Sequence, residues 1–293
     1  MPATELFPGN ITDEPVTGVG SIASHKVKLG TGDSVKRTNF FLAACLAMAL
    51  GNAARAEPIP VRHVQRPMHE FMVARSETGA VLARTEFSQV VQGDEVTLRL
   101  TYRFVDGSID DETTTFRQKG TFRLVRDHHI QKGPFFAKPV DFAVEAPNDM
   151  ATTRTTDKYG KIHDESEHMD LPDDLANGFI GTLLLNVPQN AKAFRVGLLA
   201  PVGSGRLVRL LISPDSVQPF QRNGQTLNAM VFRIHPELGG IVGVIARLLG
   251  LQPKDVMVWV LDSEEPAIVR VVGQLGGYGP VVSSELEGAS FGK

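Results

Sequence analysis

The sequence predicts an α+β fold that is mainly antiparallel β: a large curved sheet or open half-barrel with two short helices across its concave face. The clearest sign is residues 96–104, where apolar side chains occupy every second position from Val96 to Phe104 and polar ones lie between them. This period of two is typical of a strand with one buried and one solvated face. Asp106-Gly107 follows at once and indicates a tight hairpin turn.

The same pattern recurs along most of the chain after residue 67. Turn residues such as Asn148-Asp149 separate neighbouring segments. Few segments have the period of a helix, which excludes parallel folds, because these need a helical crossover between most strands. We expect strands at residues 70–75, 81–91, 96–104, 109–118, 121–131, 140–145, 150–155, 193–199, 206–212, 227–235, 256–261, 268–272 and 281–286.

Two segments interrupt the strands with helical character. Residues 173–187 begin with Asp173 and Asp174, acids that favour the first turn of a helix, and Pro188 ends the segment. Residues 241–249 are apolar on nearly every side, so this helix must be enclosed by protein or lipid. A sheet of this many strands accumulates twist and has to curl or split. We therefore expect the helices to act as a plug or lid over the hollow of a curled sheet.

An export signal lies inside the chain rather than at its first residue. Lys36 and Arg37 precede an apolar run at residues 40–50, and Ala54-Arg55-Ala56 has the small-residue pattern of a cleavage site. The run is too short for a transmembrane helix, which needs about 20 apolar residues. A buried core helix is the alternative interpretation of the same run.

These features divide the chain into three parts. We expect a leader at 1–34 that precedes the true translation start at Val35, a signal peptide at 35–56 and a single β-rich domain at 57–293. Leu42-Ala43-Ala44-Cys45 also has the shape of a bacterial lipobox, although the apolar core before the cysteine is short. Lipidation of Cys45 is therefore the less favoured alternative to plain secretion.

The mature chain is mildly acidic and contains no cysteine. Residues 57–293 carry 25 basic and 29 acidic side chains, a net charge of −4, without a basic block. This balance argues against binding to nucleic acid or to an anionic membrane surface. Loss of Cys45 with the signal leaves no disulfide, thiol nucleophile or thiolate metal site. We expect no cofactor, a periplasmic or secreted location in a bacterium, and a partner that is a hydrophobic small molecule, a lipid or an envelope protein.

Three stretches resemble a family of uncharacterised exported bacterial proteins, a domain of unknown function. They are TFRLVRDHHIQKGPFF at 121–136, EHMDLPDDLANGF at 167–179 and LQPKDVMVWVLDSEEPAIVR at 251–270. The similarity spans most of the mature chain in order. That family is similar in turn, at the level of fold, to the open half-barrels of lipoprotein carriers. The resemblance implies a curved antiparallel sheet and no activity, because a fold does not determine a function.

The stretch KIHDESEHMD at 161–170 gathers histidines and carboxylates, which are common metal ligands. On a strand, however, His163 and His168 point to opposite faces. The spacing suits a helix no better, because zinc-binding pairs on helices lie three or four residues apart. A solvated polar strand is therefore favoured over a metal site, and no metal-binding residue is assigned.

His128 is expected on an apolar face together with Phe122, Leu124 and Ile130. It is either a hydrogen-bonded core histidine or a polar group at the mouth of an apolar cavity, because ligand pockets combine apolar walls with a few polar groups. Trp259, the single tryptophan, lies in a segment that is apolar on both faces, which favours a covered central strand over a cavity wall. The candidate ligand-binding residues are His128, Lys132, Phe135, Phe136, His168, Asp170 and Trp259.

The preferred hypothesis is an exported envelope protein without enzymatic activity that holds a hydrophobic ligand or lipid-like partner in its curved sheet. Burial alone can supply affinity, at about 25 cal/mol per Å² of apolar surface. One alternative is a metal-dependent or hydrolytic periplasmic enzyme that uses His128, His168 and nearby carboxylates. Another is a structural module that docks on an envelope protein through a sheet edge. No catalytic residue is assigned.

Overall fold

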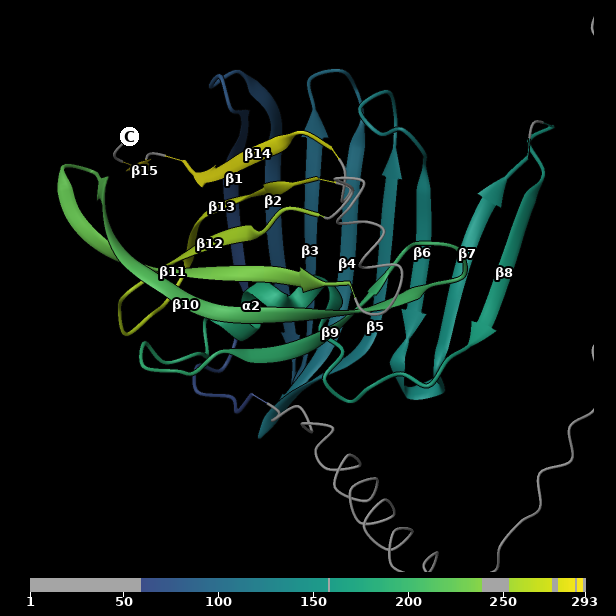
Figure 1. Cartoon of the computed structure of the whole chain (residues 1–293), viewed down its shortest axis with the longest axis horizontal. Coiled ribbons are helices and arrows are strands. Elements are labelled where there is room, and N and C mark those ends of the chain that lie inside the picture. Colours follow the sequence, from purple (N-terminus) through teal and green to yellow (C-terminus); the bar gives the residue numbers. More distant parts are fainter. Residues whose placement is uncertain (1–58, 158, 239–252, 276–278, 288, 292–293) are drawn as a thin grey trace, which may run out of the picture. The chain divides into compact units, whose positions relative to one another are not determined.

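The strands form one antiparallel sheet that bends until its two halves face each other (Figure 1). The structure is a computed structural model that describes residues 59–157, 159–238, 253–275, 279–287 and 289–291. The strands are β1 (Met68–Ser76), β2 (Val81–Gln92), β3 (Glu95–Phe104), β4 (Ile109–Lys119), β5 (Thr121–Lys132), β6 (Val140–Glu145), β7 (Met150–Thr156), β8 (Ile162–His168), β9 (Phe194–Ala200), β10 (Arg206–Arg222), β11 (Gln225–Glu237), β12 (Val256–Leu261), β13 (Ile268–Gln274), β14 (Val281–Leu286) and β15 (Ala289–Phe291). The predicted fold class, mainly antiparallel β in a large open sheet, is confirmed at this level.

Strands that follow one another in sequence are neighbours in the sheet almost throughout. The order is β15-β10-β11-β12-β13-β14-β1-β2-β3-β4-β5-β6-β7-β8, and β9 also pairs with β10. The exceptions are the pairing of β15 with β10 and that of β1 with β14, in which Met72 lies opposite Leu286. The first and last long strands of the described chain therefore meet in the middle of the sheet and join its two halves.

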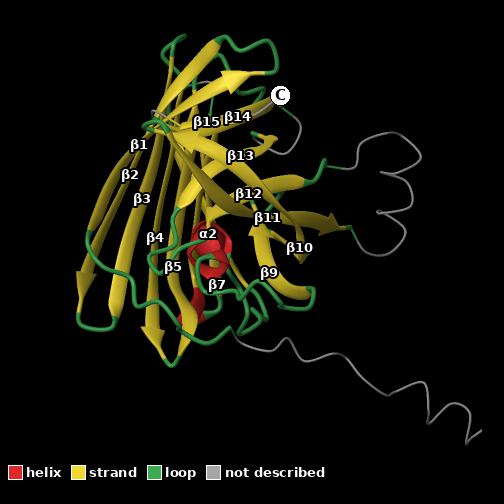
Figure 2. Ribbon diagram, turned by 90° about the vertical axis from the view of Figure 1, so that its left-hand side faces the viewer, coloured by secondary structure: helices red, strands yellow, loops and turns green. Residues whose placement is uncertain are grey.

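A short helix lies between the two halves of the sheet. Figures 1 and 2 show β1–β8 on one side, β9–β14 crossing them on the other, and the helix between. It consists of a 3-10 turn, η3 (Asn177–Phe179), that continues into α2 (Ile180–Leu184). Phe179 stacks on Phe116 of β4 with ring centroids 4.9 Å apart. The helix thus anchors to one half and helps to form the core that both halves share.

The predicted helix at 173–187 is wrong in extent, because its first residues pair with a strand. The N–H of Ala176 donates to the carbonyl of Gly197 in β9 at 2.8 Å, and the N–H of Gly197 donates to the carbonyl of Asp174 at 3.1 Å. Residues 174–176 are therefore held against β9. Asp174 does not lie in the first turn of a helix. Its carboxylate accepts a hydrogen bond from the guanidinium of Arg209 on β10.

The second predicted helix, at 241–249, lies outside the described residues, as does the segment 35–56. Two helices across the face of the sheet are therefore not confirmed. Within the described part of the chain, no helix has the length and apolar character needed to cross a lipid bilayer.

A β-bulge in β5 decides which of its side chains face the core. Thr115 of β4 pairs with Arg126 and Phe116 pairs with Leu124, so Val125 is an extra residue in β5. A single extra residue reverses the side-chain alternation that follows it. Phe122 and Leu124 are buried before the bulge, whereas Asp127 and Gln131 are buried after it. The prediction that His128 shares a face with Phe122 and Leu124 is therefore wrong.

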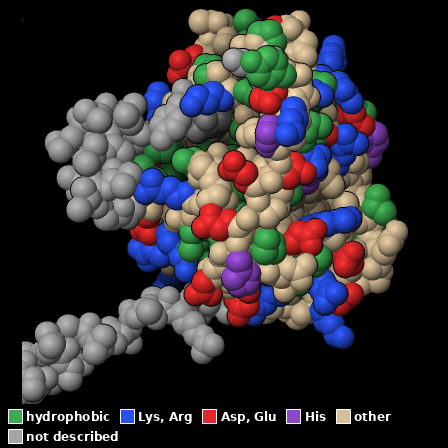
Figure 3. Space-filling model, turned by 90° about the vertical axis from the view of Figure 1, so that its right-hand side faces the viewer, with side chains coloured by type: hydrophobic (Ala, Val, Ile, Leu, Met, Phe, Trp, Pro, Cys, Tyr) green, Lys and Arg blue, Asp and Glu red, His purple; other side chains and the backbone are tan. Residues whose placement is uncertain are grey.

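The β8 end of the sheet is an exposed edge. All seven residues of β8 are exposed. Figure 3 shows the side of the molecule on which β8 lies, where acidic and basic side chains are interspersed. A bidentate contact links Arg154 of β7 to Asp164 of β8 at 2.7 and 2.9 Å. Charged side chains on an edge strand are a common means by which native sheets avoid pairing with other chains. The polar strand predicted for this segment is present.

Candidate functional site

A cavity of about 670 Å³ lies between the two halves of the sheet. Its walls come from the inner faces of β1–β6, from η3 and α2, and from β9–β13. Most of the lining is apolar, as at Leu100, Phe142, Leu184 and Val258. Ligand pockets in proteins have volumes of about 300–1,000 Å³ and mainly apolar walls. In size and character this cavity falls within that class.

Glycines let the helix approach the sheet closely. A Cβ atom on Gly178 would lie 2.1 Å from Thr114 Oγ1 and 2.8 Å from Glu112 Cδ, and one on Gly181 would lie 2.7 Å from Ile268 Cδ1. Such distances are far below van der Waals contact. Any larger residue at position 178 would therefore push the helix away from β4 and change the shape of the cavity.

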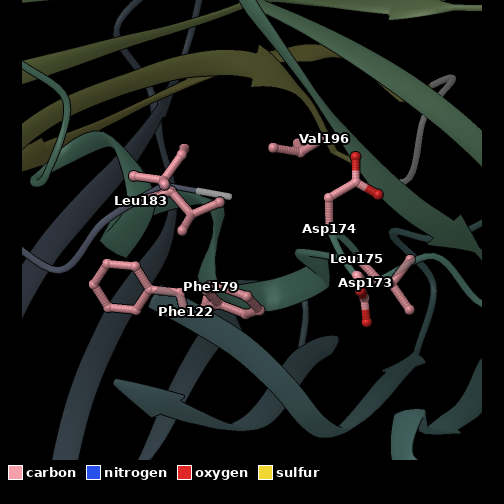
Figure 4. A pocket seen from close by; sticks show the side chains of 8 residues that line it. Phe122, Asp173, Asp174, Leu175, Phe179, Leu183 and Val196 are labelled. Carbon is pink, nitrogen blue, oxygen red and sulfur yellow. The ribbon is translucent and has the colours of Figure 1, made fainter. Parts of the chain in front are cut away.

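A second, much smaller pocket lies beside the same helix (Figure 4). Its volume is about 20 Å³, close to that of a single water probe. Phe122, Phe179 and Leu183 line one side of it, and Leu175 and Val196 are among the residues on the other. It is too small for an organic ligand, so the larger cavity is the candidate site.

The floor of the cavity carries a group of polar side chains on β4 and β5, which we call the polar island. The register places Asp110 opposite Gln131, Glu112 opposite His129 and Thr114 opposite Asp127. Apolar residues flank these rows on both sides, as Leu100 of β3 lies opposite Glu112 and Phe142 of β6 lies opposite His129. The polar island consists of Asp110, Glu112, Thr114, Asp127, His129 and Gln131.

One part of the polar island is held by Asp110. His129 Nε2 lies 2.8 Å from Asp110 Oδ1, and Gln131 Nε2 donates to Asp110 Oδ2 at 2.8 Å. Burial alone would lower the pKa of His129, but the hydrogen bond to Asp110 and the neighbouring carboxyl groups outweigh it and raise this pKa to about 9. His129 is therefore an imidazolium at neutral pH, paired with the Asp110 carboxylate.

The other part is held by Asp127. Thr114 Oγ1 donates to Asp127 Oδ1 at 2.6 Å, and Asn177 Nδ2 lies 3.2 Å from Asp127 Oδ2. Asn177 also binds β9, since its Oδ1 accepts from the N–H of Leu199 at 3.0 Å. Burial raises the pKa of Asp127, while the bonds from Thr114 and Asn177 oppose that shift. This network ties the helix to both halves of the sheet.

Glu112 lies between these two networks and belongs to neither. It lines the cavity, and none of the hydrogen bonds among the described residues involves its carboxyl group. Burial, together with the nearby charge of Asp127, raises the pKa of Glu112 to about 8, against an opposing effect of His129. Glu112 is therefore mostly protonated at neutral pH and is available to a bound molecule.

Gln89 on β2 supplies a second unpartnered group. Its side chain lines the cavity, and the residue is 3% exposed. The Nε2 group donates to the carbonyl of Arg66 at 2.7 Å, but the buried Oε1 atom has no hydrogen-bond partner. An unsatisfied buried acceptor costs about 1–3 kcal/mol. Because the Oε1 atom is itself buried, a molecule in the cavity does not reach it unless the side chain moves.

The candidates predicted from the sequence lie mostly outside the cavity. His128 is on the outer face, where its Nε2 lies 2.8 Å from Asp141 Oδ1, and Lys132 is exposed. Phe135 and Phe136 pack on Phe104, with ring centroids 4.2 and 5.5 Å away, in a separate apolar cluster at the end of β3. The structure does not bring these four residues together around one ligand.

The remaining candidates are also distant from the polar island. His168 and Asp170 are exposed at the β8 edge of the sheet. Trp259 faces outward from β12, where its Nε1 donates to Gln218 Oε1 at 3.0 Å, while Val258 next to it lines the cavity. Trp259 thus lies in a strand covered on both faces, which is the interpretation that the sequence favoured.

The residues of the predicted alternative enzyme do not converge. His128 is on β5 and His168 on β8, three strands apart, which corresponds to about 14 Å at the usual strand spacing. Among the residues that the structure describes, no group of three or more histidine, cysteine or acidic side chains has the arrangement of a metal site. The geometry therefore favours the cavity over the His128 and His168 pair.

Sequence reasoning missed the polar island, although one signal was present. On β4, Asp110, Glu112 and Thr114 lie at every second position before Phe116, and that phenylalanine is fully buried. Counting back from Phe116 in steps of two would have placed all three polar residues on the inner face. The bulge at Val125, by contrast, has no evident signature in the sequence.

Comparisons with known proteins give no activity. No protein-family model matches the chain, and no curated protein matches it. Among solved structures it is similar to the crystal structure of a beta-barrel-like protein of the domain of unknown function DUF1849 from Brucella abortus. The TM-score is 0.42 at 10% identity, over 81% of this chain and 100% of that chain. The function therefore has to be argued from the cavity.

Proposed function

We propose that the protein is an exported binding protein of the bacterial envelope that encloses a hydrophobic ligand between the two halves of its sheet. The observation that carries the proposal is the cavity of about 670 Å³ with its mainly apolar lining. Each 100 Å² of apolar ligand surface removed from water contributes about 2.5 kcal/mol to binding. A binding role of this kind requires no chemical reaction of the ligand.

The location in the envelope rests on the sequence of residues 35–56. Its test is mass spectrometry of the protein recovered from the producing bacterium. We expect a mature chain that begins at Glu57, after the Ala54-Arg55-Ala56 site. Peptides from residues 1–34 would contradict a start at Val35, and a lipid-modified Cys45 at the N-terminus would establish the lipobox alternative.

Binding is tested by filling the cavity from within. Leu100 lines it from β3, and Val90 on the neighbouring strand β2 is 56% exposed on the outer face. Leu100→Trp should lower the affinity for dodecanol at least tenfold, because the indole occupies ligand volume. Val90→Trp adds the same side chain outside the cavity and should leave the affinity unchanged.

Native mass spectrometry after mild purification and calorimetric titration with dodecanol provide the measurements. Circular dichroism of both variants shows whether the sheet is intact. A wild-type protein that is recovered empty and also ignores added dodecanol and added phospholipid would contradict the proposal.

A further inference from the structure

Glu112 is the unpartnered polar group on the wall of the cavity. Its protonated carboxyl group can donate one hydrogen bond, and its ionised form only accepts them. A ligand that is entirely apolar would leave this group unsatisfied. A ligand with a donor group can bond to Glu112, which lies at the centre of the polar island with no competing partner among the described residues.

The charges around Glu112 favour a cation over an anion. The groups that face it are Asp110 on the same strand, Asp127 and His129 on β5 and Tyr102 on β3. The η3 residues packed against it, Asn177 and Gly178, bring no charge. Three carboxyl groups therefore share a single imidazolium, which is already paired with Asp110. A cation can replace the proton of Glu112 without changing the charge of this region, whereas an anion would add a negative charge beside Asp110 and Asp127 where the dielectric constant is low.

Two basic residues also line the cavity, and they could attract an anion instead. Arg206 and Lys254 make no ion pair with any described residue. Lys254 is exposed to solvent, so its attraction for an anion is screened. Glu112 lies between β3 and β5 under Gly178 of η3, where electrostatic interactions are stronger than at the exposed Lys254. Arg206 is partly buried as well, so it is the group that would favour an anion, and binding of dodecanoate tests that outcome.

We propose that the cavity binds an amphipathic amine, an apolar chain that ends in a protonated amino group, and that Glu112 is the residue that receives this group. The inference rests on the proposed function, because it names the chemistry of the ligand in the same cavity. On binding, the carboxyl group of Glu112 releases its proton to solvent, and the ammonium N–H groups then donate to the carboxylate. One proton leaves for each amine that enters, so the charge inside the cavity is conserved.

The experiment compares three probes with the same chain length: dodecylamine, dodecanol and dodecanoate, each below its micellar concentration, titrated into the full-length protein by calorimetry at pH 7. Dodecylamine should bind at least tenfold more tightly than dodecanol, and dodecanoate more weakly than either. Titrations in two buffers of different ionisation enthalpy should show release of about one proton per dodecylamine and none for dodecanol.

Two variants isolate the role of Glu112. Glu112→Gln keeps the shape of the side chain but cannot ionise, so this variant should bind dodecylamine no more tightly than dodecanol. Glu86→Gln makes the same change on the outer face of β2, where Glu86 contacts His69 at 3.0 Å, and should preserve the preference.

The wild-type chain gives an independent measurement through its pH dependence. Because the amine requires the ionised carboxyl group, its affinity should rise by about tenfold per pH unit below pH 7 and less steeply as the pH approaches 8, while dodecanol affinity stays constant. Equal affinities for the three probes, or a dodecanoate preference, would overturn the assignment of Glu112 and leave the proposed function standing. If none of the three probes binds, the proposed function fails as well.

Discussion

Two regions of the sheet hold charged side chains among apolar ones, and they satisfy those charges differently. On the outer face of β12–β14, Arg270 Nε lies 3.2 Å from Glu285 Oε1. The same guanidinium lies over two neighbouring rings, 4.8 Å from the centroid of Trp259 and 4.9 Å from that of Phe291. On the inner face of β4–β5, His129 and Asp110 form a comparable pair, but Glu112 beside them has no partner.

The difference separates charges that stabilise the fold from a charge that is available for function. The Arg270 pair is complete, since Ser283 Oγ also donates to Glu285 Oε1 at 2.9 Å, and it faces away from the cavity. Glu112 faces into the cavity, and its burial without a hydrogen bond destabilises its ionised form. Perturbed ionisable groups in a concave site are typical of functional positions. The comparison thus points to the inner region as the one that meets a ligand.

The largest expected effect is on the pH dependence of stability. Folding raises the pKa of Glu112 from 4.5 to about 8, so its contribution is fully present below pH 4.5 and is lost as pH rises towards 8. Folding raises the pKa of His129 from 6.5 to about 9, so its contribution is present below pH 6.5 and is lost as pH rises through 9. Both signs agree. The free energy of unfolding should therefore fall by several kcal/mol between pH 5 and pH 9.

Urea unfolding at a series of pH values checks this expectation. Glu112→Gln should flatten the decline between pH 5 and 8 and make the variant more stable than the wild type at pH 8, because no ionised group then remains buried at that position. Glu86→Gln, on the outer face, should follow the wild-type curve. An unchanged slope in Glu112→Gln would show that Glu112 is well solvated and would remove the contrast with the Arg270 region.

A smaller effect is expected from the outer pair. Arg270→Met keeps an apolar contact with Trp259 but removes the ion pair and both cation–π contacts, and should cost about 1–2 kcal/mol. Because Glu285 keeps its bond from Ser283, no charge is left without a partner. The loss should therefore be the same at pH 5 and pH 9. A loss that changes with pH would show that this region is not independent of the polar island.

Much of the sheet could be predicted because the features that determine its strands and turns lie within a few residues of each other in the sequence. The alternation from Val96 to Phe104 gives one face of β3, of which Val96, Leu98 and Phe104 are buried. Asp106-Gly107 forms the predicted turn, where Gly107 adopts a φ of 85° that favours glycine. These features depend on side-chain period and turn chemistry, which are readable within a few residues.

The site could not be predicted in the same way, because its causes are not local. Whether residues 174–176 form a helix depends on a pairing with β9 some 20 residues later along the chain. The polar run from Asp110 to Thr114 resembles a solvated strand until the helix and the other half of the sheet are seen to cover it. The bulge at Val125 then reverses the orientation expected for the two histidines, so that the side chain of His129 points to the inner face and that of His128 to the outer face.

The smallest expected effect tests the orientation of these two histidines directly. His128 is half exposed on the outer face, so His128→Ala should change the free energy of unfolding by no more than about 0.5 kcal/mol and leave ligand affinity unchanged. His129→Ala is the matched control on the inner face. It should cost about 3 kcal/mol, because Asp110 would remain buried without its cation. Urea unfolding at pH 7 measures both costs. Equal costs for the two variants would mean that the side chains of β5 alternate without a break through Val125, so that His129 would not lie beside Glu112 on the inner face.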